Sequence, residues 1–228
     1  MARFLVSLAA REGQEEALQT RLLEEFRSLR SRVDEEKLSI DAMVRVPDDP
    51  FAAQYPVPRA FDAVIDFEAS GEVVSFSGWL EGIADRLVDF VHTDLSGVVT
   101  GEARRIAGSL GGPERFLYFM RRKADSTHES FGRYWGEEHA KFGKKMPGTL
   151  GYEQLHVDPA ASRTAATHAG FGISEIDGVA ILHLESVTAF GAAAGKSTVG
   201  AQAIEDERNF VDGRNSVGMA LKIVHTSR

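Results

Sequence analysis

His139 is the residue whose type and position best suit it for chemistry. It lies on an apolar stripe with the three- and four-residue spacing of one helix face, where an earlier helix of similar pattern carries Phe26. The earlier stripe is Leu18, Leu22, Phe26, Leu29 and Val33, and an offset of 113 residues aligns it with Phe131, Trp135, His139, Phe142 and Met146. A partly buried imidazole can accept or donate a proton near neutral pH. The plainer interpretation is that His139 hydrogen-bonds a backbone carbonyl or a carboxylate and fills the slot of Phe26.

The comparison of the two helices depends on an internal repeat. Arg3-Phe4-Leu5 recurs as Arg115-Phe116-Leu117, and Pro47 recurs as Pro159, each at an offset of 112 residues. Each half predicts the order βαββαβ. In the first half, strands are expected at 4–10, 38–46, 61–69 and 97–106 and helices at 14–33 and 72–92. In the second half, strands are expected at 115–123, 150–157, 177–185 and 217–225 and helices at 127–146 and 187–208, the last broken by its glycines. The sequence thus predicts two units, 1–107 and 114–228, joined by a linker at 108–113.

The fold class follows from this order of elements. A βαββαβ unit forms a four-stranded antiparallel sheet with both helices on one face, so its other face needs a partner. We therefore expect an α+β fold in which two tandem ferredoxin-like units pack sheet to sheet as a single-chain barrel. If Leu155 and Val157 face the helices, alternation along the strands turns polar residues into the barrel: Tyr152, Gln154, His156, His183, Glu185, Asp41, Arg45, Asp66 and Glu68. The segments 47–60 and 159–176 are expected to be loops that act as lids or contact surfaces.

The segment around His139 has a specific pattern of aromatic residues. Residues 131–139 read FGRYWGEEH, and this resembles the F-x-x-Y-W-x-x-x-H helix of EthD-domain proteins. The resemblance covers 114–226, and it includes Arg121-Arg122-Lys123, Pro147-Gly148, Gly151-Tyr152 and the segment 205–212. Residues 1–107 share only the order and spacing of the predicted strands and helices. The resemblance implies membership of the dimeric α+β barrel superfamily, with the first half as a degenerate copy that completes the barrel.

What the resemblance implies about function is proton transfer beside a carbonyl group. Related barrels include polyketide cyclases, dehydratases, lactone isomerases and cofactor-free monooxygenases. We expect a cofactor-independent enzyme that cyclises, dehydrates or isomerises a small apolar or aromatic carbonyl compound. His139 would be the general base or acid, Tyr134 or Tyr152 would polarise the carbonyl, and Glu138 or Asp212 would be the carboxylate near the imidazole. The expected substrate-binding residues are Phe131, Trp135, Phe142, His156, His183 and Phe210, although the aromatic ones and both tyrosines could equally be core residues.

A different class of function stays open. The chain could be a non-catalytic ligand-binding or stress-associated barrel protein that holds an apolar ligand or a partner surface. A closed cavity of roughly some hundreds of Å³ that reaches His139 would favour the enzyme, and solid packing around the imidazole would remove most of the support for it. Barrel closure needs no second chain, so any homodimer is expected to use outer surfaces.

Composition and missing motifs exclude several other classes. The chain has no cysteine, which removes thiolate metal sites and thiol nucleophiles, and its net charge of −8 disfavours nucleic acid as a partner. No apolar run approaches the ~20 residues of a membrane span, and the N-terminus predicts a strand rather than a signal peptide, so the expected compartment is the cytoplasm. Nucleotide-binding and serine-hydrolase motifs are absent. His156, His183 and Glu185 lack the usual spacing of metal ligands, and a lone histidine does not argue for haem, so no metal or cofactor is expected.

Overall fold

The computed structural model describes residues 2–31, 38–51, 61–69 and 80–227. The described residues include eight strands that close into one barrel. The first half contributes β1 (Ala2–Leu8), β2 (Leu38–Arg45), β3 (Ala63–Ala69) and β4 (Gly97–Gly108). The second half contributes β5 (Glu114–Met120), β6 (Gly151–Val157), β7 (Gly178–Leu184) and β8 (Val217–Thr226).

The order of strands around the barrel is that of two ferredoxin-like sheets joined edge to edge. It runs β1-β3-β2-β8-β5-β7-β6-β4, so in each half the fourth strand lies beside the first. The seams between the halves are the antiparallel pairs β2–β8 and β4–β6. The predicted α+β fold, with two tandem units closing a single-chain barrel, is therefore confirmed.

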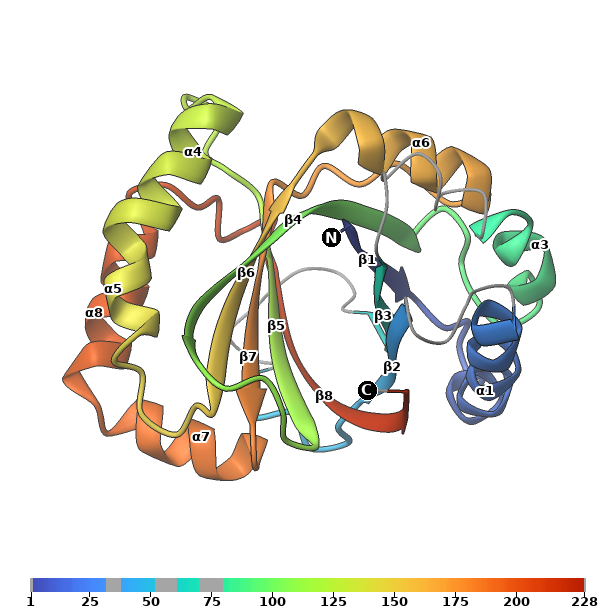
Figure 1. Ribbon diagram of the computed structural model, residues 1–228, viewed down its shortest axis with the longest axis horizontal. Coiled ribbons are helices and arrows are strands. Elements are labelled where there is room, and N and C mark those ends of the chain that lie inside the picture. Colours follow the sequence, from blue (N-terminus) through green and yellow to red (C-terminus); the bar gives the residue numbers. More distant parts are fainter. Residues whose placement is uncertain (1, 32–37, 52–60, 70–79, 228) are drawn as a thin grey trace.

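Helices cover the outside of each sheet (Figure 1). On the first sheet lie α1 (Glu15–Ser31) and α3 (Ile83–Leu87). On the second lie α4 (His128–Tyr134), the π-helix η4 (Trp135–His139), α5 (Ala140–Gly143), α7 (Val187–Gly195) and α8 (Thr198–Glu207). The predicted break in helix 187–208 falls where Ser197 caps α8. The first part of the predicted helix 72–92 lies outside the described residues, and so does Val33 of the first apolar stripe. Among the described helices, none combines the length and apolar character needed to cross a bilayer.

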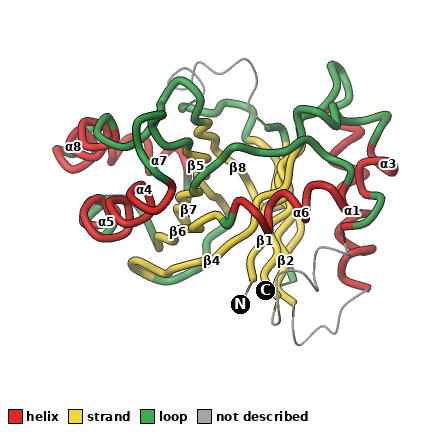
Figure 2. Tube along the Cα trace, turned by 90° about the horizontal axis from the view of Figure 1, so that it is seen from above, coloured by secondary structure: helices red, strands yellow, loops and turns green. Residues whose placement is uncertain are grey.

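The segment 159–176 was expected to be a loop, and this prediction is wrong for its first part. Residues Pro159–Ala169 form helix α6, which begins with the Asp158 carboxylate capping two backbone amides and ends at Gly170, in the left-handed conformation. Ala165, Ala166 and Ala169 pack into the core of the first half, although they belong to the second. Figure 2 shows α6 running along the barrel between the two groups of helices. The sequence pattern did not predict this helix, because its small alanine side chains form no clear apolar stripe.

Apolar residues fill three layers, one inside the barrel and one between each sheet and its helices. Leu155 and Val157 belong to the barrel interior, whereas Tyr152 belongs to the layer under α4 and η4. The predicted inward direction of Tyr152, Gln154 and His156 is therefore wrong. Both faces of β6 are buried, so alternation of apolar and polar residues could not tell the two sides apart.

The barrel interior also holds a buried network of charges. Arg3 bonds both carboxylate oxygens of Asp66, at 2.9 and 2.7 Å, and a Glu153 oxygen at 2.7 Å. His183 Nε2 lies 2.8 Å from the same Glu153 oxygen. Burial opposes ionisation of Glu153, but the His183 hydrogen bond and the Arg3 charge lower its pKa to about 2. The barrel interior is thus an apolar core crossed by ion pairs. The prediction that Asp66 and His183 point into the barrel is confirmed.

Candidate active site

An apolar cavity of about 130 Å³ lies between the second sheet and its helices. Its walls come from β5, β6 and β7, from the helices η4, α5, α7 and α8, and from Phe51 of the first half. The lining residues are Phe51, Phe116, Tyr118, His139, Phe142, Gly143, Met146, Tyr152, Ala180, Leu182, Phe190, Ala194, Gly200, Ala203, Ile204 and Glu207. The imidazole of His139 is therefore not packed solid on all sides, although the cavity is smaller than the one expected for an enzyme.

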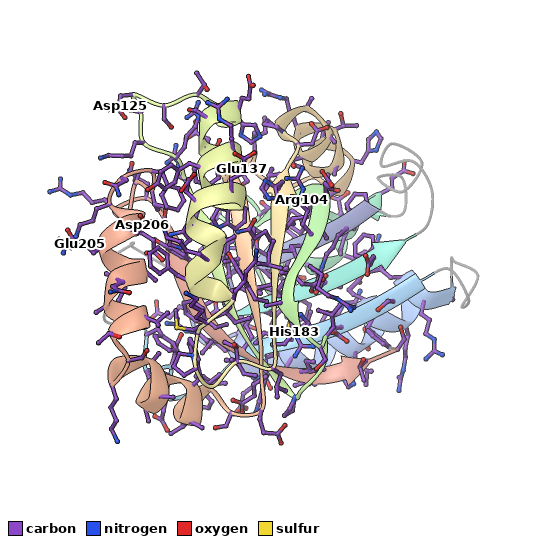
Figure 3. The ribbon with its side chains drawn as sticks, turned by 60° about the vertical axis from the view of Figure 1, so that its left-hand side comes forward. Arg104, Asp125, Glu137, His183, Glu205 and Asp206 are labelled. Atoms are coloured by element: carbon purple, nitrogen blue, oxygen red, sulfur yellow. The ribbon has the colours of Figure 1, made fainter. Side chains whose placement is uncertain are left out.

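His139 is fixed by a carboxylate on its far side. Its Nδ1 lies 2.7 Å from Oδ2 of Asp206, and the Tyr134 hydroxyl donates to Oδ1 of the same carboxylate at 2.9 Å. A carboxylate accepts hydrogen bonds, so Nδ1 carries the proton in the neutral ring and Nε2 is the free acceptor. Asp206 lies near the end of α8, which packs beside the helix formed by α4, η4 and α5 (Figure 3). The expected neighbours Glu138 and Asp212 are not the ones that hold the imidazole.

The protonation states of this pair follow from burial and hydrogen bonding. His139 is 7% exposed, and burial lowers the pKa of its imidazole more than the Asp206 carboxylate raises it. Partial burial opposes ionisation of Asp206, but hydrogen bonds from His139 and Tyr134 lower its pKa. Near neutral pH the pair is therefore a neutral imidazole beside a carboxylate, which is the state that can accept a proton at Nε2.

A π-helical turn positions His139. Residues Trp135–His139 form η4 between two α-helical segments, and such turns occur often at functional sites. The preceding helix α4 begins with a reciprocal capping box between Thr127 and Ser130. Phe131, Trp135 and His139, which are spaced four residues apart, all lie in the buried layer.

Three of the predicted site residues line the cavity together, namely His139, Phe142 and Tyr152. The Tyr152 hydroxyl accepts a hydrogen bond from Gln154 Nε2 at 2.9 Å, and burial raises its pKa, so the phenol stays protonated. Tyr134 does not line the cavity, because its hydroxyl is bonded to Asp206. Tyr134 thus holds the carboxylate that orients His139.

The other predicted substrate-binding residues are not among the lining residues. Phe131, Trp135 and Phe210 form an aromatic cluster behind His139, with Phe210 centred 5.0 Å from the imidazole. His156 packs on Trp135 with ring centres 4.8 Å apart, and burial lowers its pKa to about 4. His183 lies inside the barrel.

The three residues considered as metal ligands, His156, His183 and Glu185, lie in different parts of the fold. His156 lies in the layer under η4, His183 lies in the barrel interior, and Glu185 is exposed beyond the end of β7. In the part of the chain that the structure describes, no three His, Cys, Asp or Glu side chains are grouped to hold a metal ion.

Sequence reasoning missed Asp206 and Glu207 as site residues. Both lie in the segment 205–212 that resembles the EthD pattern, but that segment is remote in sequence from His139. The signal that could have found Glu207 is the spacing of Gly200, Ala203, Ile204 and Glu207, which marks one face of a helix. Phe51 was missed because it comes from the other half of the chain.

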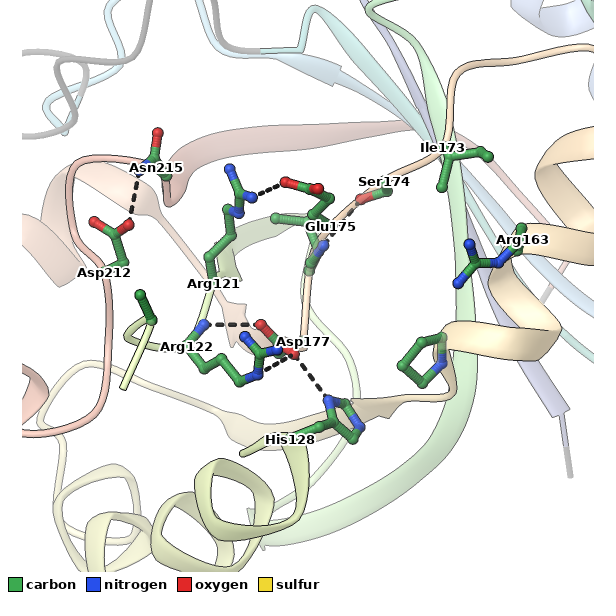
Figure 4. A pocket seen from close by; sticks show the side chains of 13 residues that line it. Arg121, Arg122, His128, Arg163, Ile173, Ser174, Glu175, Asp177, Asp212 and Asn215 are labelled. Atoms are coloured by element: carbon green, nitrogen blue, oxygen red, sulfur yellow. Dashed lines mark hydrogen bonds and ion pairs between the residues drawn. The ribbon is translucent and has the colours of Figure 1, made fainter. Parts of the chain in front are cut away.

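A larger and more polar cavity, of about 390 Å³, lies at the other end of α4 (Figure 4). Arg121 pairs with Glu175, and Asp177 accepts hydrogen bonds from the Arg122 amide and from His128 Nδ1, each at 2.8 Å. Its three arginines are balanced by three carboxylates, including Asp212. Its charged groups are thus largely engaged with one another, and most of its lining residues are polar or charged. The smaller cavity beside His139 is the better candidate.

Solved structures with the same fold include proteins of several kinds. One is an anthrone oxidase-like protein, 14% identical, with a TM-score of 0.60 over 99% of this chain and 91% of the other. A candidate monooxygenase from Fusobacterium nucleatum is 9% identical, with a TM-score of 0.58 over 99% and 93%. A chlorite dismutase variant from Candidatus Nitrospira defluvii, in complex with cyanide, is 9% identical, with a TM-score of 0.55 over 98% and 90%. At these identities the likeness establishes the fold alone.

Sequence comparison adds one match. No curated protein matches the chain. The model of the EthD domain matches residues 123–214, a range that includes His139, Asp206 and Glu207.

Proposed function

We propose that this protein is a cofactor-independent enzyme that transfers a proton beside the carbonyl group of a small apolar or aromatic compound. The observation that carries the proposal is a neutral imidazole at the wall of an apolar cavity, with Nδ1 held at 2.7 Å by Asp206. A base with a fixed tautomer, in a site of low polarity, meets the requirements of general base catalysis. Cyclisation, dehydration and isomerisation of carbonyl compounds all begin with such a proton transfer.

The size of the cavity supports a substrate with one ring. A volume of about 130 Å³ is close to that of an engineered apolar cavity of ~150 Å³ that binds benzene. Phe51, Phe116 and Phe190 contribute flat apolar walls, with Phe51 and Phe116 centred 4.6 Å apart. A single aromatic ring that carries a carbonyl group would fit these walls.

In the proposed mechanism, His139 Nε2 removes a proton from the carbon next to the carbonyl group. The electron pair of the broken C–H bond becomes the C=C bond of an enolate, and the carbonyl π pair moves to oxygen. Asp206 stabilises the imidazolium that forms. Tyr152 lines the same cavity as a neutral phenol and is the proposed hydrogen-bond donor to the carbonyl oxygen.

Hydrogen–deuterium exchange of acetophenone in D₂O tests this proposal, because exchange at its methyl group reports proton removal beside a carbonyl. Wild-type protein is expected to accelerate exchange, and His139→Phe is expected to lower the rate by roughly 10²–10⁴-fold. His225→Phe is the matched control, since His225 packs against Phe26 of α1, with ring centres 5.8 Å apart, and is not a lining residue of the cavity. Exchange unaffected by His139→Phe would refute the proposal, and tight binding of acetophenone without exchange would favour the non-catalytic ligand-binding alternative.

We also infer that the first half is a degenerate copy of the second, with units at 1–107 and 114–228. Arg3 of β1 pairs with Glu153 of β6 at 2.7 Å, and Arg115 of β5 pairs with Asp41 of β2 at 3.5 Å. Arg115 and Glu153 are each 112 residues after their counterparts Arg3 and Asp41. The two ion pairs thus exchange partners as a two-fold symmetric interface would. Phe26 in the slot of His139 supports a first half without its own base.

A further inference from the structure

The neighbouring residues Asp206 and Glu207, in the last turn of α8, have different surroundings. Gly200, Ala203, Ile204 and Glu207 follow the spacing of one helix face, and all four line the cavity. Asp206, one residue earlier, faces η4 and bonds His139. The cavity that is lined by the His139 imidazole is therefore also lined by Glu207, which comes from a different helix.

Nothing in the described part of the chain compensates a charge on Glu207. No described lysine, arginine or histidine forms an ion pair with it, whereas the exposed neighbour Glu205 pairs with Arg208 at 2.6 Å. The ionisable groups that interact with Glu207 are Asp206 on its own helix and the phenols of Tyr118 and Tyr152 on the sheet, and His139 lines the same cavity. Burial, and to a lesser extent the Asp206 charge, raise the pKa of Glu207 to about 7.

We propose that Glu207 is a second catalytic residue of this site, a general acid that protonates the carbonyl oxygen while His139 removes the proton from carbon. This inference rests on the proposed function and deepens it. A pair of titratable groups whose environments differ, one neutral base and one neutral acid in the same cavity, is the arrangement that proton transfer to and from a single substrate requires.

The step balances without another reactant. The C–H bond breaks, and its proton goes to His139 Nε2. The electron pair forms the C=C bond, the carbonyl π pair moves to oxygen, and that oxygen takes the proton of the Glu207 carboxyl group. The products are an enol, an imidazolium and a carboxylate, and reversal at the same or another carbon returns both groups to their starting states.

The same arrangement selects a class of substrate. A carboxylate ligand in this cavity would meet an ionisable Glu207, with no described lysine or arginine among the lining residues. Neutral carbonyl compounds are therefore favoured over the corresponding acids. Acetophenone is the neutral probe, and benzoate, which has a similar ring and one negative charge, is its anionic counterpart.

The pH profile of acetophenone exchange tests the role of Glu207. In the wild type, the rate should fall below the lowered pKa of His139, because the imidazolium cannot accept a proton, and should fall above about pH 7, because ionised Glu207 cannot donate one. Glu207→Gln should lower the maximal rate by roughly 10²-fold and abolish the alkaline fall while keeping the acid fall. Glu205→Gln, on the exposed side of the same turn, should leave the profile unchanged.

The outcomes separate the two proposals. Exchange that requires His139 but keeps its rate and its alkaline fall in Glu207→Gln would overturn the role of Glu207 and leave the proposed function intact. Absence of exchange in the wild type would overturn both.

The pKa of Glu207 can also be measured directly, without an activity assay. Carbon-13 NMR of protein labelled at the glutamate carboxyl carbons, with Glu207→Gln to assign the signal, should give a midpoint near 7 for Glu207. A midpoint at the ordinary glutamate value of about 4.3 would also overturn the role of this group as an acid. Benzoate that binds as tightly as acetophenone above pH 7 would overturn the inferred preference for neutral compounds.

Discussion

Replacement of His139 by phenylalanine should cost the fold little, although it removes a short hydrogen bond. The bond lost joins His139 Nδ1 to an Asp206 oxygen at 2.7 Å, and hydrogen bonds to charged groups contribute about 1.5–3 kcal/mol. Two features reduce the loss. Asp206 keeps the Tyr134 hydroxyl, and its side chain is 15% exposed, so water can take the vacated position. A phenylalanine ring would also retain the contacts with Phe142 and Phe210. We expect a net loss of about 1–2 kcal/mol in the free energy of unfolding.

Urea unfolding at neutral pH measures this quantity, and a double-mutant cycle with Asp206→Asn isolates the pair. The coupling energy should be about 1–2 kcal/mol, because each single variant already removes the bond. Thermal unfolding should show a decrease of about 2–4 °C for each kcal/mol lost. Tyr134→Phe is the matched control, since it removes the other hydrogen bond to Asp206. A loss above about 4 kcal/mol for His139→Phe, or a coupling energy near zero, would contradict the reasoning from exposure and contacts.

Three further predictions concern the surroundings of the site. Glu153→Gln should destabilise the fold by about 1.5–3 kcal/mol in urea unfolding, because Arg3 would lose one of its two carboxylate partners and keep Asp66; a loss under about 0.5 kcal/mol would contradict this. The free energy of unfolding should decrease as pH falls from 6.5 to about 4, because over this range His156 is protonated in the unfolded chain and neutral in the folded one. His156→Phe should flatten that decrease. Gly143→Ala should weaken acetophenone binding and cost about 1–3 kcal/mol, because a Cβ there would overlap the Tyr152 ring. At Gly136 a Cβ meets nothing nearer than 3.5 Å, so Gly136→Ala should leave both quantities nearly unchanged.

The sequence predicted the fold because its strongest signals are local. Leu18, Leu22 and Phe26 mark a helix face over a few turns, and the repeat of Arg3-Phe4-Leu5 places two such units in one chain. Burial of Phe131, Trp135 and His139 followed from the same spacing. The π-helical turn did not, because it depends on backbone hydrogen bonds that side-chain spacing does not report.

The parts that failed depend on contacts between distant segments. Asp206 is 67 residues from His139, and Glu138 is its neighbour in sequence, so a local argument chose the wrong carboxylate. The direction of Tyr152 depended on which face of β6 is apolar, and both faces are buried. His156 and His183 were therefore placed together, although the sheet separates them.

Covalent connection of the two sheets has a consequence for dilution. Residues 109–113 join the end of β4 to the start of β5, and the seams β2–β8 and β4–β6 form within one molecule. A short tether of this kind holds its two ends at an effective concentration in about the millimolar range. Dissociation of the halves is thus not driven by mass action, and the integrity of the cavity beside His139 should be the same at nanomolar as at micromolar protein. Specific activity in the exchange assay should accordingly be independent of enzyme concentration.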